Sequence, residues 1–405
     1  MATDMSTISG ALKRVYDDYV EKQQNLKTYA IDEIANSLSK YNAGGEGFFG
    51  AINDYGNESV GAINETESFR TIDNEHYSQW KVSPKVMVAP IEFSGLSSKA
   101  AESDDEAFVS VVVDALDTAR DRLRKDENRQ FFGLGNGTLT SPAGATSSLA
   151  TSFSVASAQY IRANMVIDVC AAGVSTLIVS AVRVTDVDKA SNVVYLSGAL
   201  GISLATTQEL VKQNIRVSQP SDGKEAMGLR GIVDDGTDLT TFQNIDASAN
   251  RIWRGRRIAA SSANLTSDLL QRLIDDVRVL SGAEPDLLLM HPLQRRKYLD
   301  IVVPQKRYAD ENMDSGHKKL SFNGRDLMLD VDCQADTVYA LTKGKIRKFE
   351  VEPLGMGTQE GSDRFLRKVG QDVFQAYWRH YINFGTSQRN AHGKISGLAV
   401  PTGIA

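Results

Sequence analysis

The chain has 405 residues, of which 41% are hydrophobic and 24% are charged, and its formal net charge at pH 7 is -6. This length predicts two or three domains, and the acidic balance argues against a general nucleic-acid binder, although it leaves room for a local basic patch. No apolar run approaches the roughly 20 residues that a membrane helix needs, and the first residues, MATDMSTISG, lack the features of a signal peptide. We therefore expect that the protein has no membrane partner and that it is made and kept in a reducing cytoplasm.

The first part of the chain, residues 1–61, is predicted to be a helical arm with a hinge. Residues 1–41 carry apolar side chains at the spacing of amphipathic helices. The segment that follows, Ala43 to Gly61, has too many glycines to favour regular structure. An arm that contacts other copies of the chain fits this pattern, and the alternative is an ordinary helical cap at the N-terminus.

Residues 62–100 are predicted to form an extended loop built on a β-hairpin. Two strand-like runs, RTIDNEHYSQWKV and KVMVAPIEFS, flank the turn pair Ser83 and Pro84. An isolated hairpin is at best marginally stable in water, and nothing nearby in the sequence offers a surface. We expect the hairpin to pack on another copy of the protein, and the alternative is a hairpin inside a single sheet.

A long helix is predicted from Ser103 to Phe132, within a domain of residues 101–150. Ser103 and Glu106 form a capping-box signature, an apolar stripe runs to Leu123, and Gly133 ends the helix. At 1.5 Å per residue the helix would be about 45 Å long. Such a helix suits a spine on which a sheet lies better than it suits an enzyme core.

Residues 151–227 change character and predict a small antiparallel β-domain. Short β-rich runs alternate with turn residues, and they read MVIDVCAA, TLIVSAVRVTDVD, NVVYLSG and NIRVSQ. This spacing is typical of a small barrel or sandwich. The chain's two cysteines, Cys170 and Cys333, lie in apolar, strand-like surroundings, so we expect buried free thiols and no disulfide.

The remainder predicts an α/β lobe over residues 228–350 and closing strands over 351–405. Thr266 or Ser267 caps a helix with a clear apolar stripe, and the apolar run DLLLM is followed by Pro292 at the first position of a second helix. The last part, DVFQAYWRHYINFGTSQRNAHGKISGL, predicts long strands with a turn near Gly385.

We find no constellation of catalytic, cofactor-binding or metal-binding residues in the sequence. The glycine cluster Gly133 to Gly137 follows a predicted helix, whereas a phosphate-binding loop follows a strand. The five histidines are scattered, and His291 at a strand–helix junction suits a structural hydrogen bond. Asp330 and Asp332 have the spacing of one strand face, but no loop beside them offers further ligands. We therefore expect them to lie on a solvated face and not to form a cation site. No G-x-S-x-G nucleophile motif occurs, so we predict that the protein is not an enzyme.

The densest basic patch comprises Arg251, Arg254, Arg256 and Arg257. The simplest interpretation is a solvated strand or ion pairs within the lobe. The functional alternatives are pairing with acidic groups of a neighbouring subunit and contact with packaged DNA. The sequence leaves these alternatives open.

The order of these parts resembles the major capsid proteins of tailed bacteriophages. The most specific local matches are SGLSSKAAESDDEAF, DLLLMHPLQRRKYL, FNGRDLMLDVD and WRHYINFGTSQRNAHGKISGL. The resemblance covers nearly the whole chain and lies in its organisation more than in any invariant motif. It implies the tailed-phage capsid fold, an α+β fold with a peripheral domain (residues 101–150 and 351–405), an axial domain (residues 228–350) and, here, an inserted β-domain (residues 151–227).

The resemblance also implies a function and a set of partners. Copies of the chain would assemble into hexamers and pentamers of an icosahedral shell around double-stranded DNA, in the host cytoplasm, and would remain in the virion capsid. Further partners would be a separate scaffolding protein, a portal and a decoration protein, with weak non-specific contact to DNA. An encapsulin-like nanocompartment and a multidomain enzyme are the alternatives. The candidate intersubunit contacts are Phe48, Phe49, Trp80, Val86, Val88, Ile91, Phe93, Arg254 and Arg257.

Some relatives crosslink a lysine of this loop to a distant asparagine. Lys81 and Lys85 lie in the predicted loop, and Asn383 and Asn390 lie near the C-terminus. Because such residues are common in any sequence, their presence does not favour a crosslink.

Overall fold

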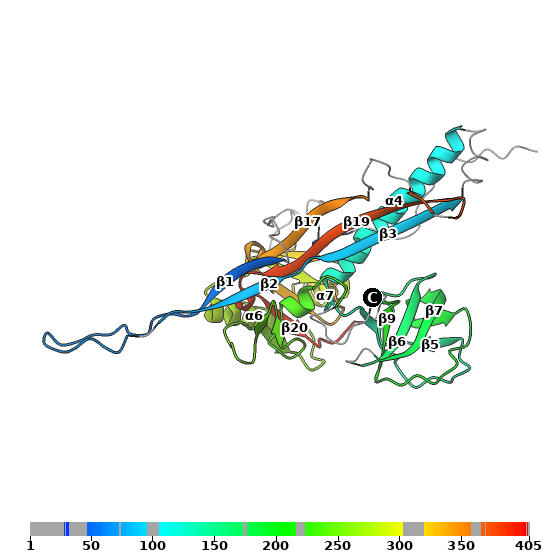
Figure 1. Cartoon of the computed structure of the whole chain (residues 1–405). Coiled ribbons are helices and arrows are strands. Elements are labelled where there is room, and N and C mark those ends of the chain that lie inside the picture. Colours follow the sequence, from blue (N-terminus) through cyan, green and yellow to red (C-terminus); the bar gives the residue numbers. More distant parts are fainter. Residues whose placement is uncertain are drawn as a thin grey trace, which may run out of the picture.

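The computed structural model describes most of the chain from residue 47 onward (Figure 1). The described residues are 28, 30–31, 47–72, 74–94, 105–172, 176–215, 223–302, 320–357, 366–368, 370–401 and 403, with the backbone alone for 105–114. The predicted helical arm of residues 1–41 therefore lies outside the described residues, apart from Thr28, Ala30 and Ile31. Within the described part, no helix is both long enough and apolar enough to cross a membrane.

The predicted spine helix is confirmed as α4 (Asp105–Phe131). It lies along a sheet of long strands (Figure 1), in which β19 (Val373–Thr386) is central. The strands β17 (Ile346–Met356), β18 (Leu366–Arg367) and β3 (Lys85–Ser94) all pair with β19. Trp378 of β19 donates its indole N–H to the carbonyl of Leu116 at 2.9 Å, which joins the helix to the sheet.

The predicted pairing across Ser83 and Pro84 is wrong. Strand β2 (His76–Val82) pairs with β1 (Phe48–Tyr55), whereas β3 pairs with β19 in another sheet. The projecting hairpin therefore consists of β1, β2 and the connecting residues 56–75, which extend away from the rest of the chain (Figure 1). The turn pair Ser83 and Pro84 instead separates two strands that belong to different sheets.

The glycine-rich segment, expected to be irregular, contains strand β1. Gly50 lies directly opposite Trp80 in the β1–β2 ladder. A Cβ atom at Gly50 would lie 2.2 Å from Cζ2 of Trp80, closer than any real carbon contact. The glycine therefore makes room for the indole ring on the strand, so it serves packing and does not interrupt the strand.

The β-rich segment forms one antiparallel sheet, called here the β-unit (residues 138–212). Its strands run in the order β4 (Thr138–Thr140), β9 (Gln208–Lys212), β6 (Val166–Ala171), β7 (Leu177–Asp188), β8 (Val193–Leu196) and β5 (Ser152–Ser154). An isolated bridge between Pro142 and Val155 links the two ends of this order, so the sheet curls towards a barrel. The unit has its own apolar core, and it begins before residue 151 because β4 lies in the stretch predicted to be a linker.

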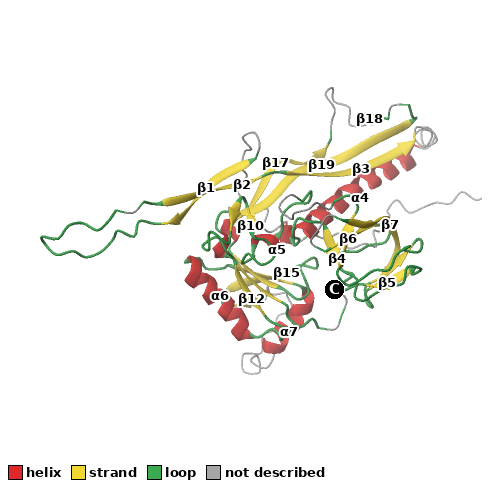
Figure 2. Cartoon of the chain, turned by 60° about the horizontal axis from the view of Figure 1, so that its bottom comes forward, coloured by secondary structure: helices red, strands yellow, loops and turns green. Residues whose placement is uncertain are grey.

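The α/β lobe is built on a six-stranded mixed sheet. Its strands run in the order β12 (Arg256–Ala259), β20 (Gly393–Ser396), β16 (Val338–Leu341), β13 (Leu287–Met290), β15 (Arg325–Leu329) and β14 (Ser321–Phe322). The helices α6 (Ser267–Ser281) and α7 (Pro292–Val302) flank this sheet (Figure 2). Thr266 caps α6 by accepting the N–H of Leu269 at 3.2 Å, and Pro292 begins α7 as predicted.

Short elements join the lobe to the spine helix. They are α5 (Leu229–Ile232), the strands β10 (Thr241–Phe242) and β11 (Ile245–Asp246), and the 3-10 turns Lys343–Lys345 and Arg389–Ala391. The guanidinium of Arg389 is fully buried among them and donates to the carbonyls of Gly231 and Ile232 at 2.9 and 3.2 Å. These bonds satisfy backbone groups that an irregular buried segment would otherwise leave unpaired.

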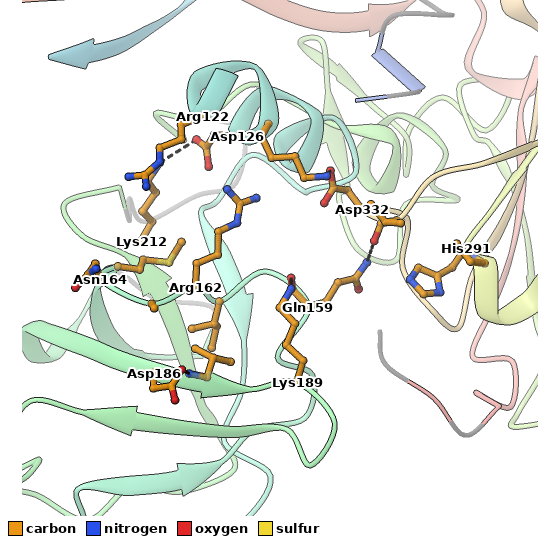
Figure 3. Close-up of a pocket in the computed structure, with 17 residues that line it drawn as sticks. Arg122, Asp126, Gln159, Arg162, Asn164, Asp186, Lys189, Lys212, His291 and Asp332 are labelled. Atoms are coloured by element: carbon orange, nitrogen blue, oxygen red, sulfur yellow. Dashed lines mark hydrogen bonds and ion pairs between the residues drawn. The ribbon is translucent and has the colours of Figure 1, made fainter. Parts of the chain in front are cut away.

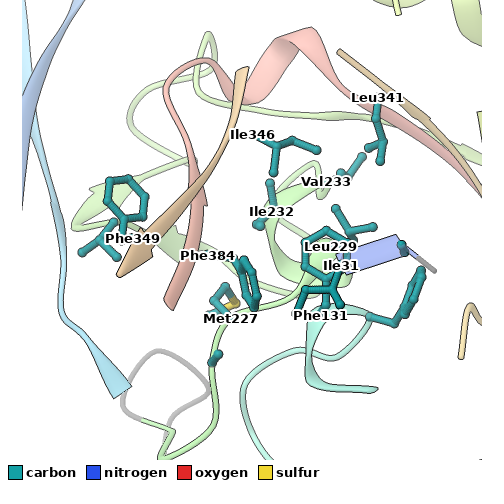
Figure 4. Close-up of a cluster of buried hydrophobic side chains, with 14 of the residues drawn as sticks. Ile31, Phe131, Met227, Leu229, Ile232, Val233, Leu341, Ile346, Phe349 and Phe384 are labelled. Carbon is teal, nitrogen blue, oxygen red and sulfur yellow. The ribbon is translucent and has the colours of Figure 1, made fainter. Parts of the chain in front are cut away.

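The largest apolar core lies where the end of α4, α5 and the long strands meet (Figure 4). Phe131 of α4 makes an edge contact with Phe384 of β19, with ring centroids 4.9 Å apart. Cys333 belongs to this core and Cys170 is buried in the β-unit, and both are free thiols as predicted.

Candidate subunit-contact surfaces

The projecting hairpin carries an unusual density of exposed apolar side chains. Phe69, Val60 and Ile72 in the connecting residues 56–75 are 88%, 85% and 80% exposed. Large exposed apolar patches on a soluble protein mark interaction surfaces. The exposed large hydrophobic residues of the hairpin are Phe49, Tyr55, Val60, Ile63, Phe69, Ile72 and Tyr77.

The hairpin tip is organised by local polar contacts. The hydroxyl of Ser59 donates to the carbonyl of Thr71 at 2.9 Å, and the N–H of Asn64 donates to the carboxylate of Glu67 at 3.1 Å. Both bonds are exposed, so each contributes only about 1 kcal/mol to the stability of the tip. The tip itself projects into solvent (Figures 1 and 2), and its own contacts leave its apolar side chains uncovered.

The base of the hairpin is anchored in the chain's own core. Phe48 is 3% exposed and Trp80 is 4% exposed, and their ring centroids lie 5.1 and 5.6 Å from that of Phe349 on β17. This corrects the expectation from the sequence, because one chain already buries both rings. Phe48 and Trp80 are core residues that fix the direction in which the hairpin projects.

Other predicted contact residues do reach the surface. Phe49 is 46% exposed, and Val86 and Val88 on β3 are 61% and 54% exposed. The remaining two apolar candidates, Ile91 and Phe93, are half-buried, and Phe93 stacks on Phe374 of β19 with centroids 5.7 Å apart. Strand alternation thus divides β3 into a face with Val86 and Val88 exposed and a face turned towards the chain itself.

The arginines of the basic run make contacts within the lobe. The Nε atom of Arg254 donates to the carbonyl of Ala247 at 2.6 Å. That of Arg257 donates to the hydroxyl of Ser396 at 3.1 Å, and its guanidinium lies 3.8 Å from Asp238. These contacts match the simplest interpretation of the sequence.

A buried polar cluster, which the sequence did not reveal, lies at the C-terminal end of α4. Lys125 pairs with Asp332 at 2.8 Å, and the amide of Asn128 donates to Asp332 at 2.6 Å and to Asp330 at 3.1 Å. The N–H of Ala30, from the segment before the hairpin, donates to Asp330 at 2.8 Å. The expectation of a solvated face was wrong, since Asp330 and Asp332 are 0% and 4% exposed. Burial raises the pKa of Asp330.

A second buried cluster joins α4 to two strands of the long sheet. His380 of β19 contacts Glu127 of α4 through Nδ1 at 2.6 Å and Glu350 of β17 through Nε2 at 2.8 Å. Burial opposes the charged imidazole, but the hydrogen bond and charge of Glu127, and then the bond to Glu350, raise the pKa of His380. Residues far apart in the sequence form this cluster, so no local pattern could indicate it.

His291 has the structural role that the sequence indicated. Its Nδ1 atom accepts the N–H of Leu293 at 3.1 Å, which caps the start of α7. Burial lowers the pKa of His291 to about 4, so the ring stays neutral and can accept this bond. Among the described side chains, no group of three or more His, Cys, Asp or Glu residues is placed to hold a metal ion.

No family model and no curated protein matches the sequence, but solved structures match the architecture over nearly its whole length. The capsid asymmetric unit of cyanophage A-1(L) has a TM-score of 0.62 at 12% identity, over 98% of this chain and 99% of that one. The chain has the fold of tailed-phage capsid proteins. The capsid of a native GTA particle has a TM-score of 0.52 at 10% identity, and a chain of Microbacterium phage Oxtober96 has 0.51 at 9%, each over 98% of this chain and 99% of its own.

This likeness confirms the predicted fold class. The spine helix α4 and the long sheet form one body, the α/β lobe forms another, and the projecting hairpin leaves the chain near the place where they meet (Figure 2).

Proposed function

We propose that the chain is the major capsid protein of a tailed phage, many copies of which close an icosahedral shell around double-stranded DNA. The observation that carries this proposal is the match to a phage capsid subunit over 98% of the chain. The exposed apolar hairpin supports it, because such a segment gains stability only when another molecule covers it. The role is structural, through repeated symmetric contacts between identical subunits.

The proposed assembly consists of hexamers and pentamers, with residues 228–350 as the axial domain and residues 101–150 and 351–405 as the peripheral domain. The projecting hairpin would lie on a neighbouring subunit, with the exposed Phe49, Val86 and Val88 extending the same contact. A separate scaffolding protein, a portal and a decoration protein are the further partners. The net charge of -6 supports only weak contact with packaged DNA. Assembly would take place in the host cytoplasm, before the subunit becomes part of the virion.

Electron microscopy of the purified full chain tests this function. The chain is produced alone and together with a candidate scaffolding protein, and each sample is fractionated by sedimentation. We expect closed shells of uniform diameter in at least one sample. A chain that stays a discrete small particle in both samples, at high concentration, would contradict the proposal. Shells that enclose an enzyme and exclude nucleic acid would favour the nanocompartment alternative.

A further inference from the structure

A cleft of about 740 Å³ lies between the β-unit, the C-terminal half of α4 and the segment around Asp332 (Figure 3). This volume is typical of ligand sites in proteins. Its lining combines charged side chains with apolar ones from the β-unit. The charged lining residues are Arg122, Lys125, Asp126, Arg162, Asp186, Lys189, Lys212 and Asp332. Five of these are basic and three are acidic.

Two of the five basic side chains are already neutralised by carboxylates of the same cleft. Lys125 pairs with Asp332 at 2.8 Å, and Lys212 pairs with Asp126 at 2.9 Å. The third carboxylate, that of Asp186, accepts the N–H of its neighbour Val187 and makes no ion pair among the described residues. The internal pairing therefore leaves a surplus of positive charge.

The surplus resides on Arg162 and Lys189, with Arg122 at the rim. No carboxylate of the described residues lies within ion-pair distance of these three side chains. Lys189 donates to the carbonyl of Gln159 at 3.3 Å, which leaves two of its three N–H groups for another acceptor. Figure 3 shows the guanidinium of Arg162 pointing from the β-unit towards α4, into the open space.

These two cations are held in an environment that disfavours their charge. Burial lowers the pKa of Arg162. Burial, and then the charge of Arg162, lower the pKa of Lys189. A guanidinium and an ammonium that share a poorly solvated space are stabilised when an anion binds between them, because an opposite charge offsets both the mutual repulsion and the lost hydration.

We propose that this cleft binds a short peptide segment of another protein, through one carboxylate held between Arg162 and Lys189. The walls beside these cations include Ile161, Met165 and Val187, which can cover apolar side chains on either side of the carboxylate. This inference does not depend on shell formation. It identifies a recognition site on the β-unit side of the subunit, away from the projecting hairpin (Figure 1).

The lining favours a carboxylate peptide over nucleic acid. Single-stranded nucleic acid is usually held by aromatic side chains on which bases stack, and the cleft lining contains no Phe, Tyr or Trp among the described residues. Asp186, which makes no ion pair among the described residues, also lies on the wall. Its negative charge repels a chain of phosphates more strongly than it repels a single carboxylate, so it limits the number of negative charges that the cleft accepts.

The test is peptide binding to the unassembled full chain, measured by fluorescence anisotropy. The probe is the labelled peptide Gly-Leu-Glu-Leu-Gly with blocked ends, compared with the same peptide carrying Gln in place of Glu. We expect the Gln peptide to bind at least about 10-fold more weakly, since charge-assisted bonds are roughly twice as strong as neutral ones. We expect Arg162→Gln and Lys189→Gln each to weaken binding of the Glu peptide by about 10-fold. Arg183→Gln, an exposed arginine of β7 outside the cleft, is the matched control and should leave binding unchanged.

Because the comparison of the two peptides uses the unmodified chain, it does not depend on how the variants fold. Equal binding of the Glu and Gln peptides, or unchanged binding in both cleft variants, would overturn the proposal. So would tighter binding of a ten-nucleotide single-stranded oligonucleotide than of the Glu peptide. Unfolding midpoints of the three variants, measured alongside, separate loss of the site from loss of the fold.

Discussion

Replacing the exposed apolar side chains of the hairpin tip should impair assembly while leaving the fold intact. The perturbation is the triple variant Val60→Ser, Phe69→Ser and Ile72→Ser. These side chains are 80% to 88% exposed in one chain, so each can still gain most of the roughly 1.5–3 kcal/mol that full burial of such a side chain provides. Together they could contribute about 5 kcal/mol to each contact between subunits, or more than a thousandfold in its association constant.

The assay is the concentration at which shells first form, measured by light scattering and sedimentation. Because the three side chains will not all be fully covered, we expect this concentration to rise by at least about 100-fold, with the free energy of unfolding of the single chain changed by less than about 0.5 kcal/mol. Phe48→Ala is the contrasting control at the base of the same hairpin. It removes a ring that is 3% exposed and should lower the free energy of unfolding by about 3–5 kcal/mol. Unchanged assembly of the triple variant would refute the reasoning.

Two further substitutions test contacts inside the chain by equilibrium unfolding. Gly50→Ala should lower the free energy of unfolding by about 1–3 kcal/mol, since the new methyl group would lie 2.2 Å from the ring of Trp80; an unchanged value would show that the strand yields. His380→Ala should lower the free energy of unfolding by about 3–5 kcal/mol, because the buried carboxylates of Glu127 and Glu350 would lose the imidazole to which both are hydrogen-bonded. This loss should be largest between about pH 4.5 and 6.5. The raised pKa of His380 makes its contribution fade as the pH rises through that pKa, and the lowered pKa of Glu350 makes its contribution fade in acid. A loss that does not vary with pH would contradict the ionised cluster.

Local patterns in the sequence were sufficient to predict the spine helix and the strand–helix pair of the lobe, although they missed the strands β1 and β4. The apolar stripe and terminal glycine predicted α4, and the buried run before Pro292 predicted the strand and helix of the lobe. These signals lie within one element and depend on its own periodicity. The order of the elements then indicated the fold, and the solved capsid structures confirm it.

Such local signals could not predict which strands pair to form the hairpin. Ser83 and Pro84 read as a hairpin turn because both flanking runs alternate and the pair favours a turn. The observed partner of β3 is β19, nearly 300 residues away, and the partner of β2 is a strand rich in glycine. What decides this pairing is the fit of Gly50 to Trp80 and of both hairpin strands to Phe349, which is a property of the packed structure.

The buried charges could not be predicted for a related reason, and their positions explain how the subunit keeps its shape. Lys125 and Asn128 are three residues apart on α4, so they lie on one face of the helix, and both bond to Asp332 of the lobe. Glu127 points in another direction and bonds to His380 of the long sheet. This one turn therefore contacts the lobe and the long sheet at once. Buried ionic contacts add little net stability but are costly to misalign. The turn therefore fixes how the lobe and the sheet are oriented about α4, while the apolar hairpin tip is left for contacts outside the chain.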